Sequence, residues 1–113
     1  MGKASLGDLD ELVLLAVAML YDNAYAFAIK QALEDEADRV VALPTVHAAL
    51  YRLEQRGYLH SSLGGATAAR GGRRKRLFRI TNAGLAALHA ARSVREQMWQ
   101  RIQERAQPLG GLT

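Results

Sequence analysis

The most restrictive feature of this sequence is residues 8–20, a stretch that is apolar on almost every side. It reads DLDELVLLAVAML, with acidic residues where the positive end of a helix dipole would lie. A helix that is hydrophobic nearly all round has to be covered on more than one side. A chain of 113 residues provides one domain. We therefore expect one side of this helix to enter the chain's own core and another to face a second chain.

Several classes of protein are excluded by what the sequence lacks. It has no cysteine, which excludes disulfides, thiolate metal sites and a cysteine nucleophile. It has no run of about 18 apolar residues, so no membrane-spanning helix is predicted. Its start lacks the charge order of a secretory signal, and we expect a cytoplasmic protein. The histidines are scattered and no nucleophile accompanies a base, so we expect no metal, no cofactor and no enzyme.

The charge is distributed unevenly along the chain. The net charge is +4, but residues 1–38 carry two basic and eight acidic side chains, whereas residues 56–79 carry seven basic and no acidic ones. A concentrated basic segment suits a polyanion such as nucleic acid. A solubilising surface loop is the alternative explanation of the same charges.

Two further helices are predicted before the basic segment. The second helix runs from about Tyr25 to Asp38, with its acidic end facing water. The third, residues 44–56, begins with Pro44, which suits a first helical turn, and ends at Gly57, which suits a C-terminal cap.

The second half of the chain predicts a hairpin and a long helix. Strands at 58–63 and 75–81 flank the glycine-rich run 64–74, so they form a hairpin with a long basic tip. The last helix, residues 83–107, would span about 37 Å at the rise of an α-helix. Such a helix is too long for a body this small to cover, and we expect it to pack on another chain.

The order of these elements predicts a mainly α fold with a small β-hairpin. Three helices, a hairpin and a long helix form a winged helix-turn-helix followed by a dimerisation helix. We assign residues 1–81 to the DNA-binding domain, 82–107 to the dimerisation helix and 108–113 to a disordered tail.

The third helix is the candidate for the major groove, because one face can hold the core while the other is polar and aromatic. Arg52 has the fork that donates two hydrogen bonds to guanine. Thr45 and His47 can bond bases or phosphate. Ala48 leaves room for a thymine methyl group, and the hydroxyl of Tyr51 reaches phosphate. The wing, residues 64–76, would grip the phosphate backbone. The side chains expected to do so are Arg73, Arg74, Lys75 and Arg76.

Apolar residues near both ends of the chain are predicted to form a dimer interface. They are Leu9 and Leu12 in the first helix and Leu88, Trp99 and Ile102 in the last. Trp99 and Met98 are also candidates for a site that binds a planar aromatic or cationic ligand. Interface packing is the simpler explanation of an apolar stripe at helical spacing, since large aromatic side chains dominate such contacts.

Four segments, in this order and spacing, resemble one family of regulators. They are residues 6–12, residues 25–29, residues 45–54 with Gly57-Tyr58-Leu59, and residues 71–75 with residues 78–84. Together they cover roughly residues 6–92. The sequence is similar in these segments to the PadR family of bacterial transcriptional regulators, in its short form with one C-terminal helix.

The resemblance implies a homodimeric repressor joined through its first and last helices. Some short members of the family bind planar aromatic drugs between paired tryptophans of the last helix. Trp99 lies about one turn later than the drug-stacking position of the family. His47 stands where the family usually has tyrosine, Ala48 where it often has proline and Ala26 where it usually has glycine. The operator preference therefore does not carry over.

The sequence is thus interpreted as a sequence-specific DNA-binding regulator, a homodimeric repressor, with double-stranded DNA as its partner. Two alternatives remain open. One is a small-molecule sensor with its ligand at the dimer interface near Trp99. The other is an interaction module whose basic wing binds an acidic protein.

Overall fold

The structure is a computed structural model that describes residues 5–64 and 74–106. Its elements are α1 (Asp8–Leu20), a 3-10 turn η1 (Tyr21–Asn23), α2 (Ala26–Ala37), α3 (Leu43–Gln55), β1 (Leu59–Leu63), β2 (Arg76–Ile80) and α4 (Asn82–Ala106). Each end lies within one residue of the end that the sequence predicts. The mainly helical fold with one hairpin is confirmed. The predicted tail, residues 108–113, and most of the wing tip lie outside the described residues.

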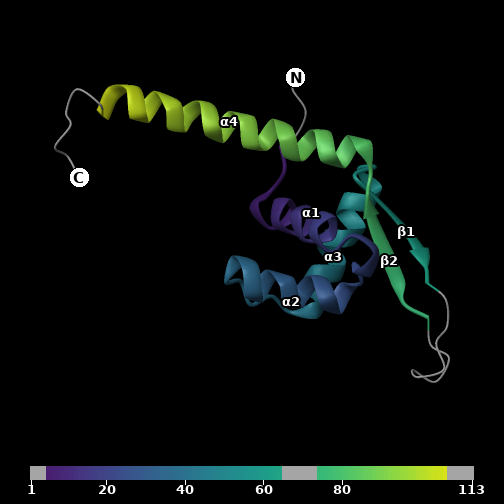
Figure 1. Ribbon diagram of the computed structural model, residues 1–113. Helices are drawn as coiled ribbons and strands as arrows, with labels where there is room; N and C mark the ends of the chain where they lie inside the picture. The colour runs from purple at the N-terminus through teal and green to yellow at the C-terminus, as the bar shows by residue number, and fades with distance from the viewer. Residues whose placement is uncertain (1–4, 65–73, 107–113) are drawn as a thin grey trace.

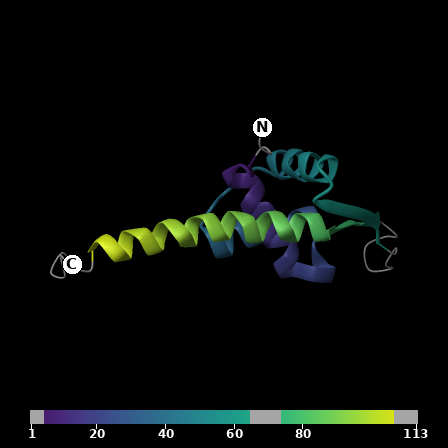
Figure 2. The same ribbon diagram turned by 90° about the horizontal axis from the view of Figure 1, so that it is seen from above.

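The short helices form a bundle beneath the long one. In Figure 1, α1, α2 and α3 lie together under the N-terminal half of α4, and the β1–β2 hairpin descends beside them. Figure 2 shows α4 crossing the body and continuing well past it. The molecule is consequently 63 Å long but only 34 Å and 21 Å across.

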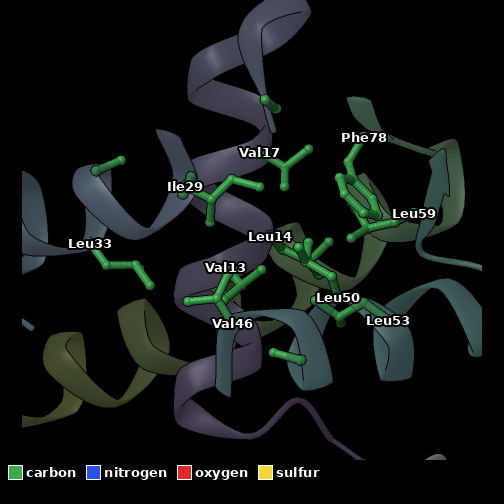
Figure 3. Packing of buried hydrophobic residues seen from close by; sticks show 14 of the residues in the cluster. Val13, Leu14, Val17, Ile29, Leu33, Val46, Leu50, Leu53, Leu59 and Phe78 are labelled. Carbon is green, nitrogen blue, oxygen red and sulfur yellow. The ribbon is translucent and has the colours of Figure 1, made fainter. Parts of the chain in front are cut away.

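Helix α1 is the centre of the core. Val13, Leu14 and Val17 are buried, and Figure 3 shows side chains from α2, α3 and the hairpin around them. The neighbours labelled there are Ile29, Leu33, Val46, Leu50, Leu53, Leu59 and Phe78. A fully buried aliphatic side chain contributes roughly 1.5–3 kcal/mol by leaving water. The apolar character of α1 therefore places it inside the domain rather than on its surface.

The hairpin is antiparallel, and backbone hydrogen bonds join it to the short extended segment before α2. Its register pairs Leu59 with Ile80 and Ser61 with Phe78. Tyr25 forms an isolated antiparallel bridge with Leu77, and the Phe78 N–H donates to the Ala24 carbonyl at 2.9 Å. This link before α2 fixes where the wing leaves the body.

Two caps hold the hairpin between α3 and α4. Gly57, with a φ of 79°, ends α3, and the N–H groups of Gly57 and Tyr58 donate to the carbonyls of Glu54 and Leu53. This is the Schellman arrangement, in which glycine avoids the strain of a left-handed φ. The Thr81 hydroxyl accepts the Gly84 N–H at 3.0 Å and donates to the Gly57 carbonyl at 2.7 Å. The predicted cap at Gly57 is confirmed, and Thr81 is the N-cap of α4.

Only half of α4 is covered by the residues that the structure describes. Leu88 lies in the core, whereas every residue from 92 to 105 is exposed. Among the described elements, none lies beneath the C-terminal half of α4 (Figures 1 and 2). The helix is thus longer than the body, as the sequence predicts.

We expect Gly84→Ala to destabilise the domain. A Cβ atom at this buried position would collide with the Tyr58 carbonyl oxygen and lie 2.8 Å from Cγ1 of Ile80. The Tyr58 carbonyl cannot move easily, because it accepts the Thr81 N–H at 3.0 Å. The free energy of unfolding in urea should fall by roughly 1–3 kcal/mol, as overpacking typically costs.

Gly7→Ser is the matched control, because a Cβ atom at Gly7 meets no atom within 4 Å. Gly7 is the N-cap of α1, where serine is favoured. The control should change the stability by less than about 0.5 kcal/mol. Equal stability of the two variants would contradict the close packing of α4 on the hairpin.

Candidate nucleic-acid interface

Helix α3 separates its core-facing residues from an open polar face. Val46, Ala49, Leu50 and Leu53 are buried. The opposite side exposes four of the residues predicted to contact DNA, Thr45, His47, Ala48 and Tyr51. This alternation follows the helical period, so anchoring α3 in the core turns these side chains outward.

The fifth predicted residue of α3, Arg52, is engaged within the chain. Its Nη2 donates to Oδ1 of Asp10 at 2.7 Å, and its Nε donates to Oδ2 at 3.3 Å. Asp10 is the buried charged residue of the described chain, and its hydrogen bond and its charge raise the pKa of Arg52. The Arg52 side chain nevertheless remains 51% exposed. This pair is not predicted from the sequence, because residues 42 positions apart carry no local signal.

The other flank of α3 is joined to the wing. Ser61 of β1 donates its hydroxyl to Oε2 of Glu54 at 2.8 Å. The same Ser61 oxygen accepts Nη1 of Arg76, on β2, at 3.0 Å. A carboxylate of α3, a serine of one strand and an arginine of the other therefore form one chain of hydrogen bonds. This chain of bonds holds the wing at a defined position beside α3.

Basic side chains of the wing lie over tyrosine rings of the segment between α1 and α2. Nζ of Lys75 is 3.6 Å from the centroid of Tyr25, and the guanidinium of Arg79 is 4.5 Å from that of Tyr21. Cation–π contacts of this kind attach a cation to a ring without neutralising its charge. Neither Tyr21 nor Tyr25 is among the residues predicted to contact DNA. The only signal for them in the sequence is two tyrosines in a predicted turn of a chain that also contains a basic strand.

The remaining predicted wing residues are only partly described. Arg74 is exposed at the start of the returning strand. Arg73 and the glycine-rich tip lie outside the described residues. Three of the four predicted basic wing residues are thus described, and Arg76 is the one joined to α3, through Ser61 and Glu54.

The residues predicted for dimerisation occupy two different environments. Leu88 belongs to the core of the chain, and Leu9 and Leu12 are half-buried against that core. Trp99 and Ile102 are exposed, Trp99 at 63%. Trp99 and Ile102 follow Leu88 at helical spacing, so all three lie on the same side of α4. This side packs on α1 near Leu88 and extends past α1 at Trp99 and Ile102.

Met98 and Trp99, the candidate ligand residues, are both exposed on α4. A groove of about 360 Å³ lies between α1 and α4, lined by residues that include Leu15, Leu88 and Glu96. The two candidate residues come after the last residue that lines this groove. The structure therefore does not bring them into this groove.

Neither a metal-binding cluster nor a membrane-spanning helix is found among the residues that the structure describes. Within residues 5–64 and 74–106, His, Cys, Asp and Glu do not gather in threes or more. His47, His60 and His89 lie on α3, β1 and α4. None of the helices described is both long and apolar enough to cross a bilayer.

The arrangement of α1–α3, hairpin and α4 defines a winged helix-turn-helix with a long terminal helix. It is similar to that of several transcriptional regulators. A PadR-like transcription factor from Bacteroides fragilis is 22% identical, has a TM-score of 0.71, and the match covers 87% of this chain and 89% of that one. A PadR family regulator from Clostridium difficile is 24% identical, with a TM-score of 0.64 over 93% of this chain and 100% of that one.

A transcriptional regulator from Clostridium thermocellum is also 24% identical, with a TM-score of 0.66 over 85% of this chain and 87% of that one. The sequence matches no family model and no curated protein. The likeness to the solved structures shows that the chain has the winged-helix fold of PadR-type regulators.

We expect Asp10 and Arg52 to be coupled in the folded state. Asp10→Asn and Arg52→Gln should each lower the free energy of unfolding, and the double variant should be no less stable than the worse single one. The coupling energy should be about 1 kcal/mol or less, because half of the arginine is in solvent, which screens the pair. Urea unfolding of the four proteins measures it.

The exposed pair Arg92–Glu96 of α4 is the control. Its side chains are 73% and 60% exposed, and a cycle of Arg92→Gln and Glu96→Gln should give a coupling near zero. Additive effects of the Asp10 and Arg52 substitutions would contradict the ion pair.

Proposed function

We propose that this protein is a member of the PadR family and a sequence-specific DNA-binding transcriptional regulator. The observation that carries the proposal is the open face of α3, with the basic wing held beside it by Glu54, Ser61 and Arg76. A helix presented next to a basic hairpin is the means by which winged helices bind the two grooves and the backbone of duplex DNA. The fold of PadR-type regulators supports the same function.

In this proposal α3 enters the major groove. Thr45, His47 and Ala48 lie toward its N-terminal end and face base edges, and Tyr51 reaches a phosphate through its hydroxyl. Arg74, Lys75 and Arg76, together with Arg73, contact the backbone. Phosphate contacts supply affinity without sequence information, so the sequence preference comes from α3.

The proposed active form is a homodimer joined through α4. Met98, Trp99 and Ile102 are large apolar side chains exposed on a part of α4 that this chain does not cover. Leu15 and Met19 on α1 are exposed as well. Burying such side chains against a second copy removes apolar area from water. Two-fold symmetry would place the two α3 helices about 34 Å apart, on a near-palindromic site.

Such a dimer would act as a repressor in the cytoplasm, by occupying DNA that the transcription machinery needs. A small-molecule effector is the second candidate, with Trp99 and Met98 contributing to a site that forms between two copies. Exposure of both side chains at the proposed interface favours it. Quenching of Trp99 fluorescence by planar cationic dyes would support the sensor, and no quenching across a varied panel would count against it.

The first test is selection of bound duplexes from a random DNA pool at about 0.15 M salt, which suppresses purely ionic binding. Recovery of an inverted repeat with half-sites one helical turn apart supports the proposal. Retention of bulk DNA without enrichment overturns it. Equal affinity for DNA and heparin would then favour a module that binds an acidic partner.

We expect loss of wing charge to weaken binding to all DNA sequences alike. Arg73→Ala with Arg74→Ala should reduce affinity for the selected site and for random duplex by the same factor. The slope of log affinity against log salt should become shallower by about 3 to 4 for the dimer, at about 0.9 per lost phosphate contact. Fluorescence anisotropy over a salt series measures both quantities.

Arg92→Ala with Arg101→Ala removes the same charge from α4 and is the control. Both arginines are exposed, away from α3 and the wing. This variant should leave the salt slope within about 1 unit of the starting protein. A change as large as that of the wing variant would argue against backbone contacts by the wing.

We expect Trp99→Glu with Ile102→Glu to separate the dimer. Each glutamate would place a charge in the proposed apolar interface, where an unpaired charge is costly. Sedimentation should then give the mass of one chain, 12.4 kDa, instead of twice that mass. Gln97→Glu, on the opposite side of α4, should leave the dimer intact. Dissociation of both variants would contradict the assignment of this face.

A further inference from the structure

The ion pair between α1 and α3 uses only part of the Arg52 guanidinium. This group carries five N–H donors in a rigid fork. Asp10 receives one bond from Nε and one from Nη2. The two N–H groups of Nη1 and the second one of Nη2 are not used by Asp10. They form the end of the fork, which can donate to two acceptors at once.

Burial in this pair is unequal. The Asp10 side chain is 11% exposed, whereas that of Arg52 is 51% exposed. The carboxylate is therefore covered by the domain while much of the arginine faces solvent. The buried Asp10 carboxylate is fixed in place, so its hydrogen bonds orient the half-exposed Arg52 guanidinium.

Arg52 lies on the side of α3 that also carries Thr45. The two residues are seven positions apart, which is two helical turns, so they lie in line along the helix. Thr45 is exposed near the N-terminal end of α3. A duplex that contacts Thr45 would therefore pass along the side of α3 that carries Arg52.

An arginine already held in one conformation loses less entropy on contacting a base than one that samples many rotamers. The Asp10 charge also offsets the attraction of Arg52 for phosphate in general. The ion pair would thus favour an oriented hydrogen-bond contact of Arg52 with a base over a non-directional attraction to phosphate. Both effects raise the ratio of specific to non-specific affinity.

We propose that Asp10 is a positioning residue for DNA recognition, which holds Arg52 by Nε and Nη2 so that the end of its fork donates to the O6 and N7 atoms of one guanine. The proposal rests on the function proposed above. It assigns a determinant of sequence preference to α1, a helix that does not enter the groove.

The test uses Asp10→Asn in the full-length protein, with the selected site and random duplex as the two ligands. Affinity for the selected site should fall by about tenfold, the effect of losing one bidentate base contact. Affinity for random duplex should stay the same or rise, because the variant has one negative charge fewer. Selection from a random pool should lose the preference for guanine at one position of each half-site.

Glu11→Gln is the matched control. Glu11 is the next residue of α1, but its ion pair is with Arg95 of α4, at 3.3 Å. The control also removes one carboxylate and one ion pair from α1. It should retain the complete base preference. Loss of the same guanine in the control would overturn the proposal, because a general change in α1 would then explain the effect.

Arg52→Lys separates positioning from charge and covers the case in which Asp10→Asn is poorly folded. Lysine keeps the charge and can pair with Asp10, but it has no fork that serves two partners. It should lose the same guanine preference as Asp10→Asn while retaining the starting helicity by circular dichroism. An unchanged base preference in Arg52→Lys or in folded Asp10→Asn would overturn the proposal.

A failure of the proposed function gives a different result. In that case the unaltered protein itself enriches no sequence from the pool. Enrichment by the unaltered protein, with base preferences insensitive to Asp10 and Arg52, rejects the positioning role alone.

Discussion

Burial of α1 is the constraint on which the rest of the molecule depends. The helix contributes Val13, Leu14 and Val17 to the core, and it contacts α2, α3, β2 and α4. Helix α3, the hairpin and α4 thus all take their positions from one buried helix.

The start of α1 carries ion pairs as well as apolar contacts. Asp8 pairs with Arg39 in the link before α3, Asp10 with Arg52 in α3, and Glu11 with Arg95 in α4. Acidic residues in a first turn stabilise a helix through its dipole, which is the only effect that the sequence pattern predicts for them. In the fold they also connect α1 to three other parts of the chain, each through an arginine.

Helix α3 is consequently fixed on both flanks. Asp10 holds one side through Arg52, and Ser61 joins the other side to the wing through Glu54 and Arg76. Between these contacts the outward face remains exposed. An interface that is rigid before binding loses less conformational entropy when it meets its partner. The polar contacts around α3 therefore matter for the proposed recognition of DNA more than for stability, to which half-exposed ion pairs contribute little.

Most of the fold could be predicted from local patterns, because periodicity and caps act over a few residues. The apolar run of α1, Pro44 and Gly57 around α3, and Thr81 before α4 mark their elements in the sequence, and the structure has each of them there. The exposed face of α3 follows from the same helical period. Pairs distant in sequence could not be predicted, since no local signal connects Asp10 with Arg52, Ser61 with Arg76 or Tyr25 with Lys75. Whether an arginine lies open to solvent or forms an ion pair inside the fold is decided by packing, because it depends on the three-dimensional position of α1 beside α3.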